Sequence, residues 1–317
     1  MRSKLACLAL GCAIAMVGCN SSGKKVIAVI PKGTSHLFWI SVQTGAEAAG
    51  KELGVQVVWN GPAQETDYSR QIQILDSMVA RHVDGIAIAA SERKALVGSI
   101  DRAAAAGIPL TVFDSAVDST NYISFVATDN VEGGRLGART LGQLLGGKGK
   151  VAMIMHAPGS ASTMDREKGF TEVIGTEFPS IQVVATQYGM SDRAKAMAAS
   201  ENILTAHPDL DGVFASSEPS SVGAALAIKG RGLSGKVKLV AFDSSDGMVE
   251  DLKGGTINAM VVQDPYKLGF EAVRTVVDKI RGKTPPKQLN LAARLIRKED
   301  LDKPEIKQLL SPVPNHQ

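Results

Sequence analysis

Residues 25–55 read KVIAVIPKGTSHLFWISVQTGAEAAGKELGV, and this stretch decides the fold. The run Val26–Ile30 is rich in β-branched apolar residues, as is typical of a strand buried in a parallel sheet. Beyond a polar loop, apolar and small residues recur at the spacing of one helix face, at Phe38, Val42, Ala46, Ala49 and Leu53. The stretch therefore predicts a strand–loop–helix unit, the repeating element of an open α/β sheet.

The loop between this strand and helix carries side chains that can donate hydrogen bonds, carry charge or stack. Lys32 and His36 are polar, and Phe38 and Trp39 are adjacent aromatic residues in a chain with only 4% aromatic residues. Ligands of open α/β sheets bind just beyond the carboxyl ends of the strands. We therefore expect a ligand to bind at this loop.

The alternation of strand and helix continues along the chain without hairpin signals. In the first half, strands are expected over 55–59, 85–89, 110–113 and 123–127, and helices over 67–81, over 92–106 and from the glycine-rich start at 133–135. In the second half, strands are expected over 150–155, 181–187, 212–215, 238–242, 257–262 and 289–295, and helices over 165–174, 192–206, 221–229 and 267–280. Roughly ten such repeats exceed one open sheet of ordinary size, so the pattern predicts an α/β fold of two similar lobes.

Residues 1–18 resemble the signal peptide of a bacterial lipoprotein. A cationic start precedes the apolar segment 5–17, which is too short to span a bilayer. The segment ends in MVGC, so that cleavage would leave Cys19 as the lipidated first residue, followed by a linker over 19–24. An ordinary signal peptide that happens to contain a cysteine is the alternative.

The positions of the cysteines and the net charge exclude an internal disulfide and argue against a nucleic-acid-binding protein. All three cysteines lie within residues 1–19, so the mature chain cannot form an internal disulfide. Removing residues 1–18 takes away two cations and lowers the formal net charge from +3 to +1. A nearly neutral chain lacks the concentrated basic face that nucleic-acid binding needs. We expect an exported, membrane-anchored monomer that faces the periplasm or the cell exterior and has no nucleic-acid partner.

Five short runs carry a family resemblance: ATDNVEGG from 127, DREKGF from 165, TAHPDLDGVFA from 205, VAFD from 240 and VQDP from 262. Together they resemble the ribose-binding-protein family, the type I periplasmic sugar-binding proteins of ABC transporters. The resemblance implies two Rossmann-like lobes that close on a small ligand, joined by three crossovers near Thr128, Gln263 and Lys287. It implies an N-terminal lobe and a C-terminal lobe with these bounds: 25–127 with 264–287, and 128–263 with 288–317.

The resemblance implies that Phe38 and Trp39 are the aromatic pair that sandwiches a sugar ring, since the apolar face of a sugar stacks well on an aromatic plane. Alternatively, Phe38 is a core residue of the helix face, and Trp39, one position further round, lies idle at the surface. Lys32 and His36 stand where ribose binders have uncharged residues. They are either ligand contacts or exposed side chains without a role.

The resemblance also implies that Asp114, Arg166, Asp243 and Gln263 hydrogen-bond to sugar hydroxyls, Arg166 through a fork that grips two adjacent oxygens. Each has an alternative. The two aspartates could cap helices, Arg166 could be a solvated helix residue paired with a neighbouring glutamate, and Gln263 could only brace the hinge.

This chain departs from the family's pattern in ways that bear on the ligand. The family's Asn-Asp pair appears here as Ser217-Glu218, which we include in the site, and Ser115 replaces an arginine. The first loop also resembles the autoinducer-2-binding branch, but Arg166 stands where that branch has an acidic residue and an amide. We therefore expect a sugar, polyol or sugar-like ligand other than ribose.

The sequence contains no catalytic or metal-binding motif, and we expect no cofactor. The run 142–148 has the glycines and lysine of a phosphate-binding loop, but Gly149 replaces the required Ser or Thr and a strand follows. Ser91 and Lys94 have an acyl-enzyme spacing without its partner motifs. The expected function is delivery of a ligand to an ABC permease. A receptor for chemotaxis or signalling, including one for autoinducer-2-like ligands, and an exported enzyme are the alternatives.

Overall fold

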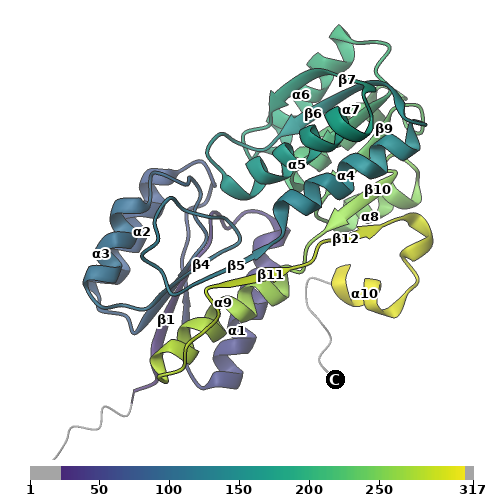
Figure 1. Cartoon of the computed structure of the whole chain (residues 1–317). Helices are drawn as coiled ribbons and strands as arrows, with labels where there is room; N and C mark the ends of the chain where they lie inside the picture. The colour runs from purple at the N-terminus through teal and green to yellow at the C-terminus, as the bar shows by residue number, and fades with distance from the viewer. Residues whose placement is uncertain (1–22, 311–317) are drawn as a thin grey trace, which may run out of the picture.

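The computed structural model describes residues 23–310, so the predicted signal peptide and Cys19 lie outside the described residues. Within this range the chain forms two α/β lobes, each built on a six-stranded sheet (Figure 1). The predicted fold class is confirmed. Among the helices of residues 23–310, none is long and apolar enough to cross a membrane.

The first lobe contains a sheet of strand order β11-β5-β4-β3-β1-β2 in which every pairing is parallel. Its strands are β1 (Val26–Ile30), β2 (Gln56–Trp59), β3 (Gly85–Ile88), β4 (Leu110–Phe113), β5 (Ser124–Thr128) and β11 (Gln288–Leu291). Its helices are α1 (Leu37–Leu53), α2 (Tyr68–Ala80), α3 (Val97–Ala105) and α9 (Pro265–Ile280). Side chains of α1 and α9 join one apolar core and those of α2 and α3 another, so helices cover both faces of the sheet.

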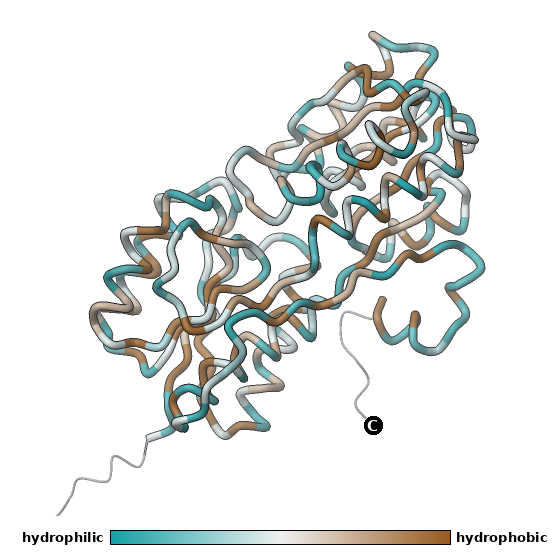
Figure 2. The backbone as a smooth tube through the Cα atoms, in the orientation of Figure 1, coloured by the Kyte–Doolittle hydropathy of each residue, from teal (hydrophilic) through white to brown (hydrophobic). Residues whose placement is uncertain are grey.

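The second lobe repeats this plan with strand order β12-β10-β9-β8-β6-β7. Its strands are β6 (Lys148–Met155), β7 (Ser180–Tyr188), β8 (Gly212–Ala215), β9 (Lys238–Phe242), β10 (Ala259–Val262) and β12 (Arg294–Ile296). Its helices are α4 (Asn130–Leu144), α5 (Ala161–Glu177), α6 (Arg193–Ala206), α7 (Glu218–Gly230), α8 (Asp246–Lys253), α10 (Pro304–Leu310) and the 3₁₀ turn η1 (Lys298–Asp300). The inner strands are apolar on both faces, as the brown traces at the centre of each lobe show (Figure 2).

Three connections cross between the lobes: β5 to α4, β10 to α9, and β11 to β12. The last crossing corrects the sequence prediction. The expected single strand 289–295 is two strands in different sheets, because β11 pairs with β5 and β12 pairs antiparallel with β10. The boundary predicted after residue 287 therefore moves to 292–293. An apolar pattern that continues through both strands does not reveal that the chain changes sheets between them.

Two helices of the second lobe have no counterpart in the sequence prediction. The eight-residue α8 buries only Met248 and Leu252, too few to establish a helical period. The polar tail forms α10, which buries Ile306 in the apolar core that also contains Met248 and Leu252. Neither helix changes the predicted class of fold.

Candidate ligand-binding site

A polar cleft lies between the lobes, where the carboxyl ends of strands from both sheets face each other. It encloses about 340 Å³ of space outside protein atoms, part of it open to solvent. All ten ligand residues selected from the sequence line this cleft: Lys32, His36, Phe38, Trp39, Asp114, Arg166, Ser217, Glu218, Asp243 and Gln263. The structure thus brings together residues that lie up to 231 positions apart in the sequence, from Lys32 to Gln263.

The sequence analysis missed five further residues of the cleft wall: Glu65, His156, Ser162, Thr163 and Pro219. Glu65 lies in the loop after β2, and His156 directly follows β6. Both loops leave the carboxyl ends of strands, the same signal that identified Lys32. Inspecting every strand end for polar side chains would have found both residues.

Asp114 and Asp243 occupy the same position in the two lobes, directly after β4 and β9. Their φ angles are 59° and 68°, a region that is costly for residues other than glycine. In each case the backbone N–H donates to a valine carbonyl of the neighbouring strand at 2.8 Å. Asp114 is not the N-cap of a helix, so that alternative is wrong for Asp114. Asp243 Oδ2, however, accepts a hydrogen bond from the Glu218 backbone N–H at the start of α7, at 3.0 Å, so Asp243 does cap a helix. Such strained residues concentrate at functional sites.

Asp114 lines the cleft beside Lys32. Its Oδ2 atom is 2.9 Å from Lys32 Nζ, and both side chains are buried. The contact is an ion pair without hydrogen-bond geometry, since Asp114 Oδ2 has no hydrogen-bond donor among the described residues. Lys32 Nζ instead donates across the cleft to Ser162 Oγ at 2.9 Å and Ser160 Oγ at 3.3 Å. Lys32 therefore joins the lobes, whereas Asp114 can accept a hydrogen bond from a ligand.

Arg166 is buried in the opposite wall and is held on three sides. Its Nε donates to Asn130 Oδ1 at 2.9 Å, and its Nη1 donates to the Ser216 carbonyl at 3.0 Å and lies 3.8 Å from Asp243 Oδ2. The guanidinium carbon lies 3.9 Å from the centre of the Phe242 ring. The alternative of a solvated arginine paired with a neighbouring glutamate is wrong. The guanidinium is fixed in place, as recognition of a ligand's oxygens requires.

A close approach of two helices sets the position of Arg166. A Cβ atom on Gly134 of α4 would lie 1.9 Å from the Arg166 carbonyl oxygen in α5. Only glycine permits this contact, so α5 packs directly on α4 and delivers Arg166 to the cleft.

Gln263 connects the second lobe to the hinge. Its Nε2 donates to Asp243 Oδ1 at 2.7 Å, and its Oε1 accepts from Thr128 Oγ1 at 2.7 Å. Thr128 and Gln263 end or follow β5 and β10, the strands from which two crossovers leave. Gln263 therefore braces the hinge in addition to lining the cleft. Burial raises the pKa of Asp243 above its ordinary value, against the opposing effect of Arg166.

The aromatic pair differs from the predicted sandwich. Trp39 is 2% exposed and packs in the apolar core, with its Nε1 donating to Glu65 Oε1 at 2.8 Å. Phe38 contacts Trp39 edge to face, with ring centroids 4.9 Å apart and planes at 87°. No slot for a sugar ring exists between two rings in this contact. The alternative that Trp39 lies at the surface is wrong as well.

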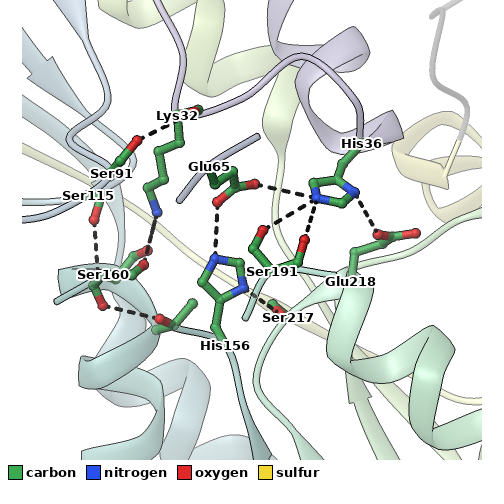
Figure 3. A network of polar contacts seen from close by, with 12 residues as sticks. Lys32, His36, Glu65, Ser91, Ser115, His156, Ser160, Ser191, Ser217 and Glu218 are labelled. Atoms are coloured by element: carbon green, nitrogen blue, oxygen red, sulfur yellow. Dashed lines mark hydrogen bonds and ion pairs between the residues drawn. The ribbon is translucent and has the colours of Figure 1, made fainter. Parts of the chain in front are cut away.

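A network of hydrogen bonds and ion pairs around His36 and His156 also links the two lobes (Figure 3). His156 Nε2 lies 3.0 Å from Glu65 Oε2. His36 Nε2 lies 3.2 Å from the Ser191 carbonyl, and His36 Nδ1 lies 3.5 Å from Glu218 Oε2. His36 is therefore a buried bridging residue and not an exposed side chain.

Two buried carboxylates of this network, Glu65 and Glu218, have pKa values shifted from the ordinary value of a glutamate. Burial alone would raise the pKa of Glu65, but His156, Lys32 and His36 outweigh burial and hold it well below its ordinary value. Burial raises the pKa of Glu218, although Arg193 opposes the shift. The wall of the cleft thus carries positive and negative charges that largely pair with one another.

Glu167 lies beneath the cleft and supports it. Its Oε1 accepts from the His156 backbone N–H at 3.1 Å and from Ser216 Oγ at 2.9 Å. Burial raises the pKa of Glu167 from 4.5 to about 7, despite these hydrogen bonds and the nearby Arg166. Among residues 23–310, no cluster of three or more His, Cys, Asp or Glu side chains could hold a metal ion.

Comparison with known proteins defines the class. Residues 27–284 match the family model described as a periplasmic binding protein domain. The chain is 28% identical over 278 residues to the ribose import binding protein RbsB of Bacillus subtilis, covering 87% of this chain and 89% of that protein. It is 31% identical over 259 residues to the D-allose-binding periplasmic protein of Escherichia coli, covering 79% of this chain and 83% of that protein.

Solved structures agree with these relatives. A carbohydrate transporter solute-binding protein of Agrobacterium radiobacter in complex with D-arabinose has a TM-score of 0.89 and 35% identity, covering 92% of this chain and 100% of that chain. An ABC transporter solute-binding protein of Agrobacterium vitis bound to α-D-tagatopyranose has a TM-score of 0.87 and 32% identity, covering 90% and 99%.

This chain belongs to the periplasmic binding protein family, as a type I protein of the ribose-binding group. The family and these relatives are solute-binding proteins and not enzymes, which confirms the predicted class. Membership also implies an exported, periplasmic protein.

Proposed function

We propose that this chain is the extracytoplasmic solute-binding lipoprotein of an ABC transporter, which binds a sugar or polyol between its lobes and delivers it to a membrane permease. The main support for this proposal is that Asp114 of one lobe and Arg166 and Asp243 of the other line a single cleft. The sugars in the two similar structures support a carbohydrate as ligand.

The cleft suits a neutral ligand that has several hydroxyl groups. Asp114 and Asp243 accept hydrogen bonds from hydroxyls, and Arg166 donates to their oxygens, so one polyol can satisfy both kinds of group. An analogue that lacks one hydroxyl would leave a buried charge unpaired and would bind more weakly. Lys32 is already paired with Asp114 and two serines, which leaves it little capacity to neutralise an anionic ligand.

Binding would proceed by closure of the lobes about the three crossovers. Ligand first engages one lobe, and the other lobe then rotates onto it. Contacts such as Lys32 with Ser162 and Glu65 with His156 join the two lobes directly, so they form only when the lobes are together. The closed form would then present surfaces of both lobes to the permease.

The lipid anchor on Cys19 rests on the sequence pattern of residues 1–24, and the monomeric state is part of the same proposal. A Cys19→Ala variant, expressed with its signal, should lose incorporation of labelled fatty acid and leave the membrane fraction. Continued incorporation would contradict lipidation at Cys19. Light scattering of the soluble form, beginning after Cys19, checks the monomer.

The ligand is tested by calorimetry and thermal-shift screening of this soluble form. The panel contains D-ribose, D-allose, D-arabinose, D-tagatose, D-fucose and sugar alcohols. Ligand at about 100 times Kd stabilises a protein by about 2.7 kcal/mol, which a melting curve detects. The absence of any response across the panel would contradict the proposed function.

Two variants test the assignment of residues. Asp114→Asn and Arg166→Lys should each weaken binding roughly 10- to 100-fold, the loss of one or two charge-assisted hydrogen bonds. The matched control is Asp118→Asn, a partly exposed aspartate beyond the same strand that is not part of the cleft lining. Unchanged affinity in either cleft variant would remove that residue from the site.

A further inference from the structure

The first lobe has a second functional edge, on the side opposite the cleft. All pairings in its sheet are parallel, so the amino ends of the six strands share this edge. The described chain begins here, just before β1, at the end of the first lobe that points away from the second lobe (Figure 1). We call this edge the base and define it by the loops that enter the strands: 23–25, 54–55, 81–84, 106–109, 119–123 and 281–287.

The base carries an excess of positive charge. Its loops contain a single acidic residue, Asp84, which is half-buried. The last turns of the adjoining helices are nearly balanced, with Lys51, Arg102 and Lys279 against Glu52 and Asp278. The cations of the base loops are all exposed, and there are six: Lys24, Lys25, Arg81, Arg281, Lys283 and Lys287.

Ion pairs neutralise only two of these six cations. Lys25 Nζ lies 2.8 Å from Asp84 Oδ1, and Lys283 Nζ lies 3.0 Å from Asp278 Oδ1. The other four form no ion pair with a residue that the structure describes: Lys24, Arg81, Arg281 and Lys287. Their charge therefore remains available to an anionic partner outside the chain.

Two of the unpaired cations are held in place by neutral groups. Arg281 Nη2 donates to the Leu53 carbonyl at 2.6 Å, and Lys287 Nζ donates to the Thr120 carbonyl at 3.2 Å. Lys287 Nζ also lies 4.0 Å from the centre of the Tyr122 ring. These contacts fix the loop 281–287 on the base without cancelling its charge.

The corresponding edge of the second lobe lacks this excess. The loops that enter β6 to β10, together with the first residue of each strand, contain four cations and two acidic residues: Lys148, Arg231, Lys236, Lys238, Asp209 and Asp211. The same count over the first lobe gives six and one, because none of its strands begins with a charged residue. The positive end is therefore a property of the lobe in which the chain begins, and the small net charge of the whole chain conceals it.

We propose that the base docks on the anionic headgroups of the membrane that holds the lipid anchor. Only four residues lie between Cys19 and Lys24, so an anchored Cys19 would keep the base within about 18 Å of its lipid. Lys and Arg side chains this close to an anionic bilayer are attracted to it. The tether rests on the proposed function, whereas the charge of the base does not. In this orientation the cleft faces away from the bilayer and stays accessible to ligand.

Vesicle flotation tests the docking with the soluble form that begins after Cys19. One set of vesicles contains phosphatidylcholine alone, and the other contains equal parts of phosphatidylcholine and phosphatidylglycerol. We expect binding to the phosphatidylglycerol vesicles at about 0.01 M salt, where the Debye length is about 30 Å, and its loss at about 1 M, where it is about 3 Å. Equal binding to both sets, or none at low salt, would overturn the proposal.

Two triple variants that remove the same charge locate the binding surface. The first should weaken binding to phosphatidylglycerol vesicles about 100-fold. It changes three exposed cations of the base: Lys24→Gln, Arg81→Gln and Lys283→Gln. The second should change binding little, because it acts on the corresponding edge of the second lobe: Lys148→Gln, Arg231→Gln and Lys236→Gln. An equal loss in both variants would mean that only net charge matters and would overturn the assignment to the base.

Lysine footprinting tests the orientation of the anchored chain. In the mature chain Cys19 would be the only thiol, so it can be coupled to a maleimide-bearing lipid of the vesicle. With phosphatidylglycerol present, an amine reagent should modify Lys24 and Lys287 several-fold more slowly than with phosphatidylcholine alone. Lys148 and Lys236 should react at the same rate in both. Equal rates at Lys24 and Lys287 in the two kinds of vesicle would overturn the proposal.

Sugar binding, measured on the same proteins, separates the docking from the proposed function. None of the three residues changed in the base lines the cleft, so the base variant should bind the sugar of the panel as the wild type does. Sugar binding without vesicle binding would refute the docking and leave the function intact. Vesicle binding without any response to the sugar panel would refute the function and leave the docking intact.

Discussion

Replacing Glu167 by glutamine should stabilise the protein at about pH 8 and change its stability little at about pH 5. Glu167 is 7% exposed, and burial raises its pKa from 4.5 to about 7. Its Oε1 accepts hydrogen bonds from the His156 N–H and Ser216 Oγ. A glutamine has an amide oxygen that can accept both bonds, so the variant imitates the protonated form of Glu167.

The sign follows from the protons bound in each state. Between pH 4.5 and about 7, the folded chain retains the Glu167 proton and the unfolded chain has lost it. The free energy of unfolding therefore falls as the pH rises through this window. Each unit of pKa difference corresponds to about 1.36 kcal/mol, so the full penalty above neutrality is about 3 kcal/mol. Below pH 4.5 both states are protonated and the penalty is absent.

Urea unfolding of the wild type and the variant at about pH 5 and about pH 8 measures the effect. Glu172→Gln is the matched control, because it removes an exposed carboxylate of the same helix whose ion pair with Arg135 should contribute at most about 1 kcal/mol. A difference between wild type and Glu167→Gln that is the same at both pH values would refute the reasoning.

Two further predictions concern packing around the cleft. Gly134→Ala should lower the free energy of unfolding by about 1–3 kcal/mol and weaken sugar binding, because α4 must move away from Arg166. Gly175→Ala, at an open position of α5, should instead raise the free energy of unfolding by up to about 1 kcal/mol in the same urea titrations. Trp39→Phe should lower the free energy of unfolding by about 1–3 kcal/mol, because Glu65 Oε1 loses its indole donor. Calorimetry with the bound sugar should also show weaker binding by this variant. A variant as stable as the wild type would contradict the role of the Trp39 contact.

Much of the fold was predictable because each lobe repeats a strand–loop–helix unit whose signals are local. Buried strands such as Val26–Ile30 are continuous apolar runs, and helices such as α1 show one apolar face. The crossing from β11 to β12 was not predictable, since both strands are apolar and nothing local marks a change of sheet. The sequence alone defines elements more readily than it defines which sheet receives them.

The lining of the cleft was also predictable, from strand ends and from the family's motifs, but the partners of its side chains were not. Lys32 pairs with Ser162, 130 positions away in the other lobe. Trp39 turns into the core because Glu65, in a loop after another strand, accepts its indole N–H. Long-range contacts of this kind decide whether a polar side chain faces a ligand or another residue, and no local pattern encodes them.

The two lobes correspond strand by strand, which explains why cleft residues occur in matching places. The order β2-β1-β3-β4-β5-β11 of one sheet matches β7-β6-β8-β9-β10-β12 of the other. Asp114 and Asp243 therefore directly follow equivalent strands and have the same unusual backbone conformation. The loops after β1 and β6 differ, however, because one carries Lys32 and the other His156. The shared positions place acceptors on both sides of the cleft, and the loops that differ decide which further groups each lobe contributes to binding and closure.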